Sequence, residues 1–323
     1  MNKLLKNKKT MKQFSCIVFI CALMAGCSGE QFAPEAETPV VPGDERVALA
    51  VQSAGLEAEM TPATRAALTS GSIGIYLSGS GYTTLQNKRY DYSGGAWAPY
   101  DAANTIFLGN TEASVCAYHP YTSSAGTVSS LPLTTQAYAA NQELSYATNQ
   151  TVSGSSRNVS FSLVRAYSLI RVIIKRHATG FPGTCNVTTM NLSNIISNTT
   201  LNISNGVQAA TNSVVSNKLS SIPINQTLAA SATTQKDILA VPCTFATTTV
   251  NGVSNCGLSI ELIVDGKSMI AGISRATLSQ LDKGKQYNIT VTINGSSLGI
   301  NSIEQAPAWQ EVAVNGGDAV PVP

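Results

Sequence analysis

Few side chains in this sequence could perform acid, base or nucleophilic chemistry. The candidate groups are two histidines and two pairs of acids: His119, His177, Glu57 with Glu59, and Asp265 with Asp282. Paired carboxylates can act as general acid and general base. No nucleophile elbow, phosphate loop, dinucleotide fingerprint or metalloprotease helix accompanies them, so we interpret them as solvated charges at turns and strand ends. The sequence therefore predicts no enzyme activity, no metal site and no cofactor.

Cysteines are the next reactive group. Seven occur, and three of them lie within residues 1–27. The other four are Cys116, Cys185, Cys243 and Cys256, whose spacing matches no zinc motif. We predict isolated buried thiols, with a disulfide as the alternative. A hairpin turn at 251–252 (NG) would place Cys243 and Cys256 out of register, so these two are not expected to pair directly.

Tyrosines and tryptophan gather between residues 76 and 100. Tyr90 and Tyr92 precede the turn 93–95 (SGG), and Trp97 follows it. Exposed rings can stack on the faces of sugars, so these three residues are candidate glycan contacts. The competing interpretation is that they pair across the strands of a hairpin, which is the commoner role of such aromatics.

The first 27 residues resemble a bacterial lipoprotein signal. Five lysines precede an apolar run that is too short to span a bilayer, and the run ends in LMAGC at residues 23–27. We predict that the thiol of Cys27 receives the lipid, which would anchor the protein in the outer membrane at the cell surface. The alternative is a plain signal peptide with a chance cysteine, and Met11 is a second possible start.

Composition indicates an all-β body. Charged residues make up 12% of the chain and apolar residues 43%, and Ser, Thr and Asn are abundant. These polar residues compete with helical hydrogen bonds, and Thr favours strands. Without the signal, 15 basic and 18 acidic residues remain, a net charge of about −3. A mildly acidic chain with no basic stripe argues against nucleic acid as a partner.

Alternating apolar residues and turn signals predict strands from residue 47 onward. Residues 28–46 are rich in Glu and Pro and are predicted to be a flexible linker. The segment 177–183 (HATGFPG) breaks the strand pattern, so we predict one β-domain over 47–178 and a second over 179–323. The Asp-Gly pair at 265–266 and the Asn-Gly pair at 294–295 are typical of tight hairpins.

Several segments together resemble the fimbrillin family, the lipoprotein-derived subunits of type V pili. They are the lipoprotein signal, Thr64-Arg65-Ala66, 117–121 (AYHPY), 144–148 (LSYAT), 159–163 (VSFSL), 238–242 (ILAVP), 281–287 (LDKGKQY) and Trp309. One departure is Arg165-Ala166, where family members often carry His-Ala. The resemblance implies two transthyretin-like β-sandwich domains in tandem and assembly by strand exchange. The partners implied are other pilin subunits and an Arg-specific protease.

The same mechanism can be read from the residues around Arg65. Val47, Leu49 and Val51 alternate in a predicted strand that precedes the Pro-containing segment 61–65 (TPATR). Cleavage between Arg65 and Ala66 would release this strand and leave a groove with an unpaired edge, which a strand of another subunit could fill. Arg46 is a rival cleavage site, and the alternative is that Arg65 is an ordinary surface charge.

The candidate donor strand is the C-terminal tail, residues 310–323. Val312 and Val314, and then Val320 and Val322, alternate on either side of a glycine turn. Fully extended, this tail would reach about 46 Å. Pro321 and Pro323 suit an edge strand, because each lacks an N–H donor. The alternative is that the tail folds back on its own domain or is disordered.

The sequence therefore predicts a structural subunit of cell-surface fimbriae. The alternative is a surface lipoprotein adhesin that binds glycans or host surfaces through the aromatic cluster.

Overall fold

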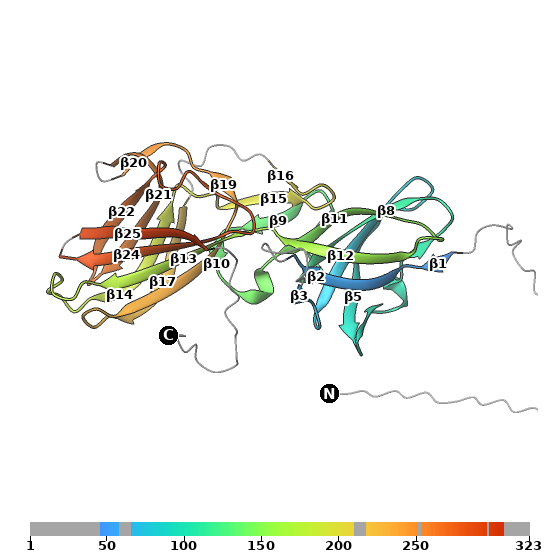
Figure 1. The fold of residues 1–323 in the computed structure, drawn as a ribbon, viewed down its shortest axis with the longest axis horizontal. Helices are drawn as coiled ribbons and strands as arrows, with labels where there is room; N and C mark the ends of the chain where they lie inside the picture. Colours follow the sequence, from blue (N-terminus) through green and yellow to red (C-terminus); the bar gives the residue numbers. More distant parts are fainter. Residues whose placement is uncertain (1–45, 58–65, 210–217, 251–252, 296, 307–323) are drawn as a thin grey trace, which may run out of the picture. The chain divides into compact units, whose positions relative to one another are not determined.

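The described part of the chain consists mostly of β-strands. The computed structural model describes residues 46–57, 66–209, 218–250, 253–295 and 297–306 (Figure 1). Within these ranges the helical elements are two short 3-10 turns, η1 (Ala102–Asn104) and η2 (Ala140–Gln142). The prediction of an all-β chain is confirmed. No helix in these ranges is long and apolar enough to cross a membrane.

The largest sheet holds eight strands and begins the described chain. In spatial order these are β3 (Ala66–Ala67), β2 (Ala50–Leu56), β12 (Asn158–Arg165), β11 (Ser145–Val152), β8 (Ala113–His119), β4 (Ser72–Ser78), β5 (Leu85–Ser93) and β6 (Ala96–Pro99). The pair β2 and β12 is parallel and the others are antiparallel. β2 also contacts β6, so the sheet curls and strands near its two ends share one apolar core. Beside it, β1 (Val47–Ala48) pairs with β7 (Phe107–Leu108).

Two further sheets face each other across a second core. The first contains β10 (Gln136–Ala137), β18 (Thr233–Ala240), β13 (Ser168–Arg176), β24 (Gln286–Asn294) and β25 (Ser297–Ala306). The second contains β17 (Lys218–Thr227), β14 (Asn186–Ser193), β21 (Val253–Val264) and β20 (Thr248–Val250), with β22 (Lys267–Ser274) also paired to β21. Alternate residues of β13 and β24 pack against those of β14 and β21, as the period-two pattern predicts.

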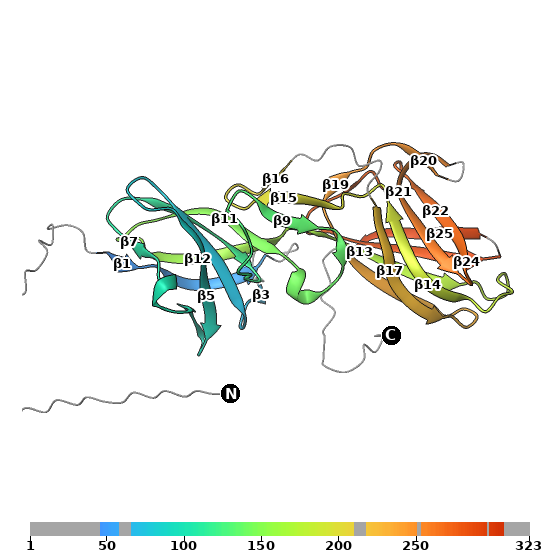
Figure 2. The same ribbon diagram turned by 180° about the vertical axis from the view of Figure 1, so that it is seen from behind.

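Short strands join these two parts of the chain. β9 (Leu131–Thr134) pairs with β15 (Asn198–Asn202), which also pairs with β16 (Val207–Gln208). β19 (Cys243–Thr244) pairs with β23 (Gln280–Leu281), and β10 joins β18 in the sheet of the second core. Figure 2 shows β9, β15 and β16 in this region. A third core, which includes Tyr118, Tyr146, Leu169 and Leu239, is shared between residues from both halves. The described residues between 46 and 306 accordingly belong to one compact unit.

The predicted boundary between residues 178 and 179 does not coincide with a change of sheet. β13 lies before that boundary, yet it pairs with β18 and β24, which lie after it. The chain leaves the eight-stranded sheet at Arg165 and enters the next sheet at Ser168, through Ala166 and Tyr167. Both connecting residues are buried and neither is Gly or Pro, so the junction carries no loop signal. The division into two domains stays a prediction.

Both predicted hairpin turns are present. Asp265 and Gly266 have φ values of 48° and 75° between β21 and β22, and Gly295 has a φ of 58° between β24 and β25. The Asp265 carboxylate also accepts hydrogen bonds from the backbone N–H groups of Cys185 (3.0 Å) and Asn186 (2.8 Å). The turn therefore fixes the start of β14 as well as the hairpin.

All four predicted thiols are free. Cys116, Cys185 and Cys256 are buried and Cys243 is half-buried. Burial raises the pKa of each thiol, to about 12 for Cys116 and to about 11 for Cys243. The interpretation as isolated thiols is confirmed for this part of the chain.

We expect these four thiols to resist alkylation in the native protein. At pH 8 each unit of raised pKa lowers the reactive thiolate fraction about tenfold, and burial also blocks access. Peptide mapping after iodoacetamide treatment should show the four cysteines unmodified in native protein and modified in denatured protein. Rapid alkylation of native Cys116, or an intact mass that indicates a disulfide, would contradict this prediction.

Candidate assembly site

The N-terminal strands β1 and β2 are separated only by Leu49, and together they form one segment, residues 47–56, called the plug strand. Leu49 is 4% exposed and Val51 is 7% exposed, and Val47 packs against the same core from a half-buried position. The predicted alternation of these three residues is therefore present. The plug strand is an integral part of the first core and does not lie loose on its surface.

Backbone hydrogen bonds hold the plug strand on both sides. The Leu49 N–H donates to the Ile106 carbonyl (2.8 Å), and the Ala50 N–H donates to the Arg157 carbonyl (3.0 Å). Further along, the Glu57 N–H donates to the Leu163 carbonyl (2.8 Å). Between these points β2 runs parallel to β12, as Figure 1 shows.

A bulge interrupts the plug strand after Val51. The register moves from Val51 opposite Val159 to Ser53 opposite Ser160, so Gln52 is the extra residue. Gln52 and Ser53 are both exposed, and the inward side resumes at Ala54. A bulge of this kind re-aims the side chains that follow it. The simple alternation predicted for residues 47–53 therefore ends at Val51.

The groove that receives the plug strand is apolar. The floor residues of the same core are Ile106, Leu108, Val159, Phe161 and Leu163, all buried. Burial of Leu49 and Val51 contributes roughly 1.5–3 kcal/mol each, and each ladder hydrogen bond roughly 0.5–1.5 kcal/mol. Loss of the plug strand would expose this floor and leave β12 as an unpaired edge.

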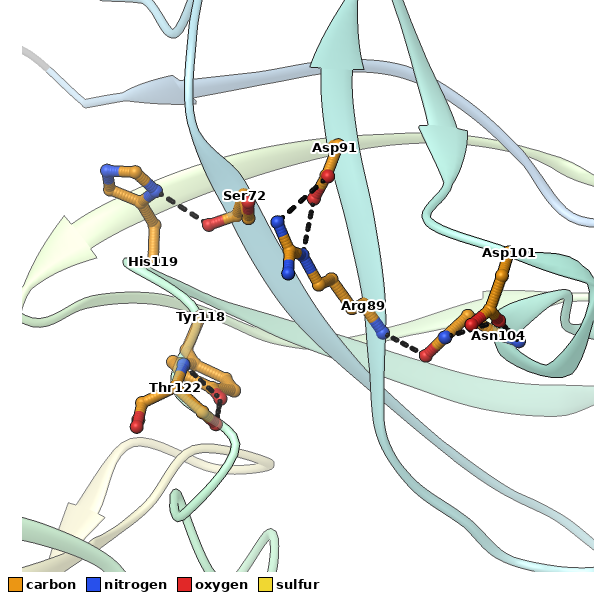
Figure 3. A network of polar contacts seen from close by, with 8 residues as sticks. All are labelled: Ser72, Arg89, Asp91, Asp101, Asn104, Tyr118, His119 and Thr122. Carbon is orange, nitrogen blue, oxygen red and sulfur yellow. Dashed lines mark hydrogen bonds and ion pairs between the residues drawn. The ribbon is translucent and has the colours of Figure 1, made fainter.

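The sequence did not predict β7 or the segment 101–106 that leads into it. Asn104 links this segment to β5, because its Oδ1 accepts from the Arg89 N–H (2.8 Å) and its Nδ2 donates to Asp101 Oδ1 (2.7 Å) (Figure 3). Arg89 also forms an ion pair with Asp91, with Nε 2.8 Å from Oδ1. The signal that could have revealed the segment is Asp101 three residues before Asn104, followed by the apolar 106–108 (IFL).

Charge around this network is balanced locally. Burial alone would raise the pKa of Asp91, but hydrogen bonds from Arg89 and Ser72 outweigh burial and hold that pKa below its ordinary value. Burial lowers the pKa of His119, whose Nδ1 lies 3.0 Å from the Ser72 carbonyl oxygen (Figure 3). At neutral pH His119 is therefore uncharged and acts as a packing residue.

The predicted processing site borders the plug strand. Ala66 is the first residue of β3, which pairs with β2 through Leu56 opposite Ala66 and Gly55 opposite Ala67. Arg65 lies outside the described residues. Arg46 is exposed and directly precedes Val47. A cut after Arg65 would separate the plug strand from the rest of the chain, whereas a cut after Arg46 would leave it attached.

Two other predicted features lie outside the described residues. They are the lipidation site Cys27 and the candidate donor strand with Val312, Val314, Val320 and Val322. The described chain ends at Ala306 in β25, the edge strand of its sheet.

Two of the three candidate glycan contacts lie in the core, which corrects the hypothesis made for Tyr90 and Trp97, whereas Tyr92 is half-buried. Tyr90 is 1% exposed and Trp97 is 7% exposed, and the Tyr90 hydroxyl accepts a hydrogen bond from the Ile106 N–H (3.2 Å). Tyr92 lies opposite Trp97 in the β5–β6 hairpin, with ring centroids 5.4 Å apart in an edge-on arrangement. The competing interpretation of cross-strand pairing is the one observed.

The acidic pairs considered for catalysis are engaged separately. Asp265 caps the start of β14, and Asp282 Oδ2 accepts a hydrogen bond from the Tyr287 hydroxyl (3.1 Å). Glu57 is exposed, and Glu59 lies outside the described residues. No group of three or more His, Cys, Asp or Glu residues that could hold a metal ion occurs in the described ranges.

Comparisons with known proteins agree with this architecture. Two crystal structures of candidate cell adhesion proteins share the fold at 16% identity each. The one from Bacteroides uniformis has a TM-score of 0.56 over 81% of this chain and 98% of its own. The one from Bacteroides ovatus has a TM-score of 0.57 over 82% of this chain and 99% of its own. No curated protein matches the chain. The family model described as fimbrillin-like matches residues 61–306, and the chain therefore belongs to the fimbrillin-like family.

Proposed function

We propose that this chain is a structural subunit of cell-surface fimbriae, with no enzymatic activity. In this proposal it is exported as an outer-membrane lipoprotein that carries its lipid on Cys27, and an Arg-specific protease cuts it between Arg65 and Ala66. Subunits then assemble by β-strand exchange, and the chain folds as two transthyretin-like sandwiches. The family assignment supports a fimbrial role.

The observation that carries the proposal is the burial of the plug strand. A strand whose Leu49 and Val51 complete an apolar core cannot leave without a replacement, because its groove would face water. The plug strand also lies between Cys27 and Arg65 in the sequence, so a single cut after Arg65 frees it together with the lipid-bearing end.

A strand from another subunit would restore both kinds of contact. Main-chain hydrogen bonds to the edge of β12 would supply affinity, and apolar side chains at alternate positions would refill the groove. The tail 310–323 has the required alternation of valines, and it belongs to every copy of the chain.

We expect an Arg-specific protease to convert the purified full-length protein into oligomers. The new chain should begin at Ala66 by N-terminal sequencing, and a ladder of multiples should appear on unboiled gels and by native mass spectrometry. A protein that is fully cut at Arg65 and stays monomeric at high concentration would contradict strand exchange.

Two matched variants separate the rival cleavage sites. Arg65→Lys should block both the Ala66 terminus and the oligomers, whereas Arg46→Lys should leave both unchanged.

Deletion of residues 310–323 tests the donor strand, because it should keep the cleavage and abolish the oligomers. Oligomers that persist after this deletion would assign the donor strand to another segment.

The alternative function is a surface adhesin that binds glycans. The burial of Tyr90 and Trp97 removes the site first considered for it. A pocket lined by Tyr121 and Gln142, away from the plug strand, is a separate candidate for glycan binding.

A further inference from the structure

A pocket of about 350 Å³ opens beside the start of the β8–β9 connection. This volume lies at the small end of the range for small-molecule sites, which is about 300–1,000 Å³. Its lining comes from three separated segments: residues 118–136 around β9, residues 141–144 around η2, and Tyr167. The pocket is distinct from the groove of the plug strand, because none of its lining residues belongs to the core that contains Leu49.

Two buried tyrosines make part of the wall rigid. The Tyr118 hydroxyl lies 2.6 Å from Asn87 Oδ1. It also lies 2.9 Å from the Thr122 carbonyl oxygen (Figure 3). The Tyr167 hydroxyl accepts a hydrogen bond from the Thr134 N–H (3.1 Å). Burial raises the pKa of both hydroxyls, to about 12 for Tyr118, so they stay protonated and neutral. These two side chains fix the inner wall of the pocket, and being buried they expose little ring surface of their own.

A third aromatic ring is accessible. Tyr121 lines the pocket and is half-buried, and the guanidinium carbon of Arg89 lies 5.4 Å from its ring centroid. The charge of Arg89 is already paired with Asp91. The Tyr121 ring is therefore held in place by a cation that is not itself free to attract an anion.

Three carboxamides supply the polar part of the lining. The side chains of Gln136, Asn141 and Gln142 make no hydrogen bond to any residue in the described part of the chain. Each carboxamide offers two donors and one acceptor oxygen. No lining residue in the described ranges carries a charged side chain. The pocket thus combines the accessible ring of Tyr121 with neutral donors and acceptors.

We propose that this pocket binds a neutral saccharide of one or two pyranose units. A pyranose has apolar C–H faces that stack on aromatic rings and a rim of hydroxyls that both donate and accept hydrogen bonds. Tyr121 would receive the C–H face, and Gln142 and Asn141 would bond the hydroxyls. An uncharged lining suits an uncharged ligand, because a carboxylate or ammonium group would lose its hydration without gaining an ion pair.

A proline-rich peptide is the competing occupant, because aromatic grooves also bind such segments. A polyproline peptide offers mainly carbonyl acceptors and has few N–H donors. It would leave the acceptor oxygens of the three carboxamides unpaired, whereas sugar hydroxyls can satisfy both donors and acceptors. The lining therefore favours the saccharide.

Saturation-transfer NMR on the uncut, detergent-solubilised full-length protein tests this proposal. The probes are the methyl glycosides of glucose, galactose, mannose and N-acetylglucosamine, together with lactose and the anionic 3′-sialyllactose. We expect saturation transfer to at least one neutral sugar. Binding titrations should show affinity falling about tenfold or more in both Tyr121→Ala and Gln142→Ala.

Matched variants serve as controls. Tyr100 is 58% exposed and contacts the same Arg89 from outside the pocket, so Tyr100→Ala should leave sugar affinity within about twofold. Gln235 in β18 is exposed and does not line the pocket, so Gln235→Ala is the control for Gln142→Ala. Thermal melting checks that each variant is folded.

Four outcomes would overturn the proposal: no saturation transfer to any neutral sugar, sialyllactose bound more tightly than lactose, sugar affinity unchanged in folded Tyr121→Ala, or displacement of the sugar by a peptide of residues 310–323. All these measurements use uncut protein. Their failure is therefore separate from a failure of cleavage-dependent assembly.

Discussion

Replacing Leu49 by alanine is expected to lower the free energy of unfolding by about 2–5 kcal/mol. Leu49 is 4% exposed and packs in the core of the first sheet, so the change removes buried methyl groups and leaves a cavity. The Leu49 N–H bond to the Ile106 carbonyl is a backbone bond, and the substitution keeps it. The loss should therefore come from packing alone. Urea denaturation of the uncut full-length protein measures it.

Ser53→Ala is the matched control on the same strand. Ser53 is exposed at the bulge, and a surface substitution of this kind is expected to change stability by no more than about 0.5 kcal/mol. After cleavage at Arg65, Leu49→Ala should also release the plug strand faster than the unchanged protein does. If Leu49→Ala and Ser53→Ala were equally mild, the plug strand would contribute little to the core, and the assembly proposal would lose its basis.

Replacing Asp237 by alanine is expected to cost about 3–5 kcal/mol, because it leaves the charge of Arg171 largely buried and unpaired. In the native protein Arg171 Nε and Nη2 donate to the two oxygens of Asp237 at 2.9 and 2.8 Å. Only 12% of the Arg171 side chain and 13% of the Asp237 side chain are exposed. The hydrogen bond from Arg171 to Asp237 raises the pKa of the guanidinium, which therefore stays charged. Chemical denaturation measures the loss.

The double variant Arg171→Met with Asp237→Leu is the informative control. It replaces both charges with apolar groups, so it should recover most of the stability that Asp237→Ala loses. Asp91→Ala provides a second comparison, because the Arg89–Asp91 pair is more exposed, at 32% and 29%, and its loss should be smaller. A double variant that is less stable than Asp237→Ala would show that the ion pair itself stabilises the sheet.

Arg171 lies inside an apolar run of the sequence, and its burial could not be predicted from that run. A charged residue inside the apolar run 169–174 argues against burial of both faces. The structure resolves this because Asp237 lies directly opposite Arg171 on β18, sixty-six residues along the chain. No local pattern links these two positions.

Local patterns were sufficient wherever a feature depends on neighbours in sequence. They predicted the all-β class, the inward alternation of Val47, Leu49 and Val51, and the hairpin turn at Asp265 and Gly266. The period of two in a strand and the positive φ of a tight turn are properties of a few consecutive residues, so composition and spacing reveal them.

The tertiary structure alone decided which strands pair and which faces turn inward. It placed β2 parallel to β12, assigned β13 to the later sheet, and directed Tyr90 and Trp97 into the core. It also brought Tyr121, Gln142 and Tyr167 around one pocket. Alternation defines two faces of a strand, but the choice of buried face and of partner depends on packing against residues far away in sequence. For that reason the plug strand could be predicted from its own residues, whereas its groove and the saccharide pocket could not.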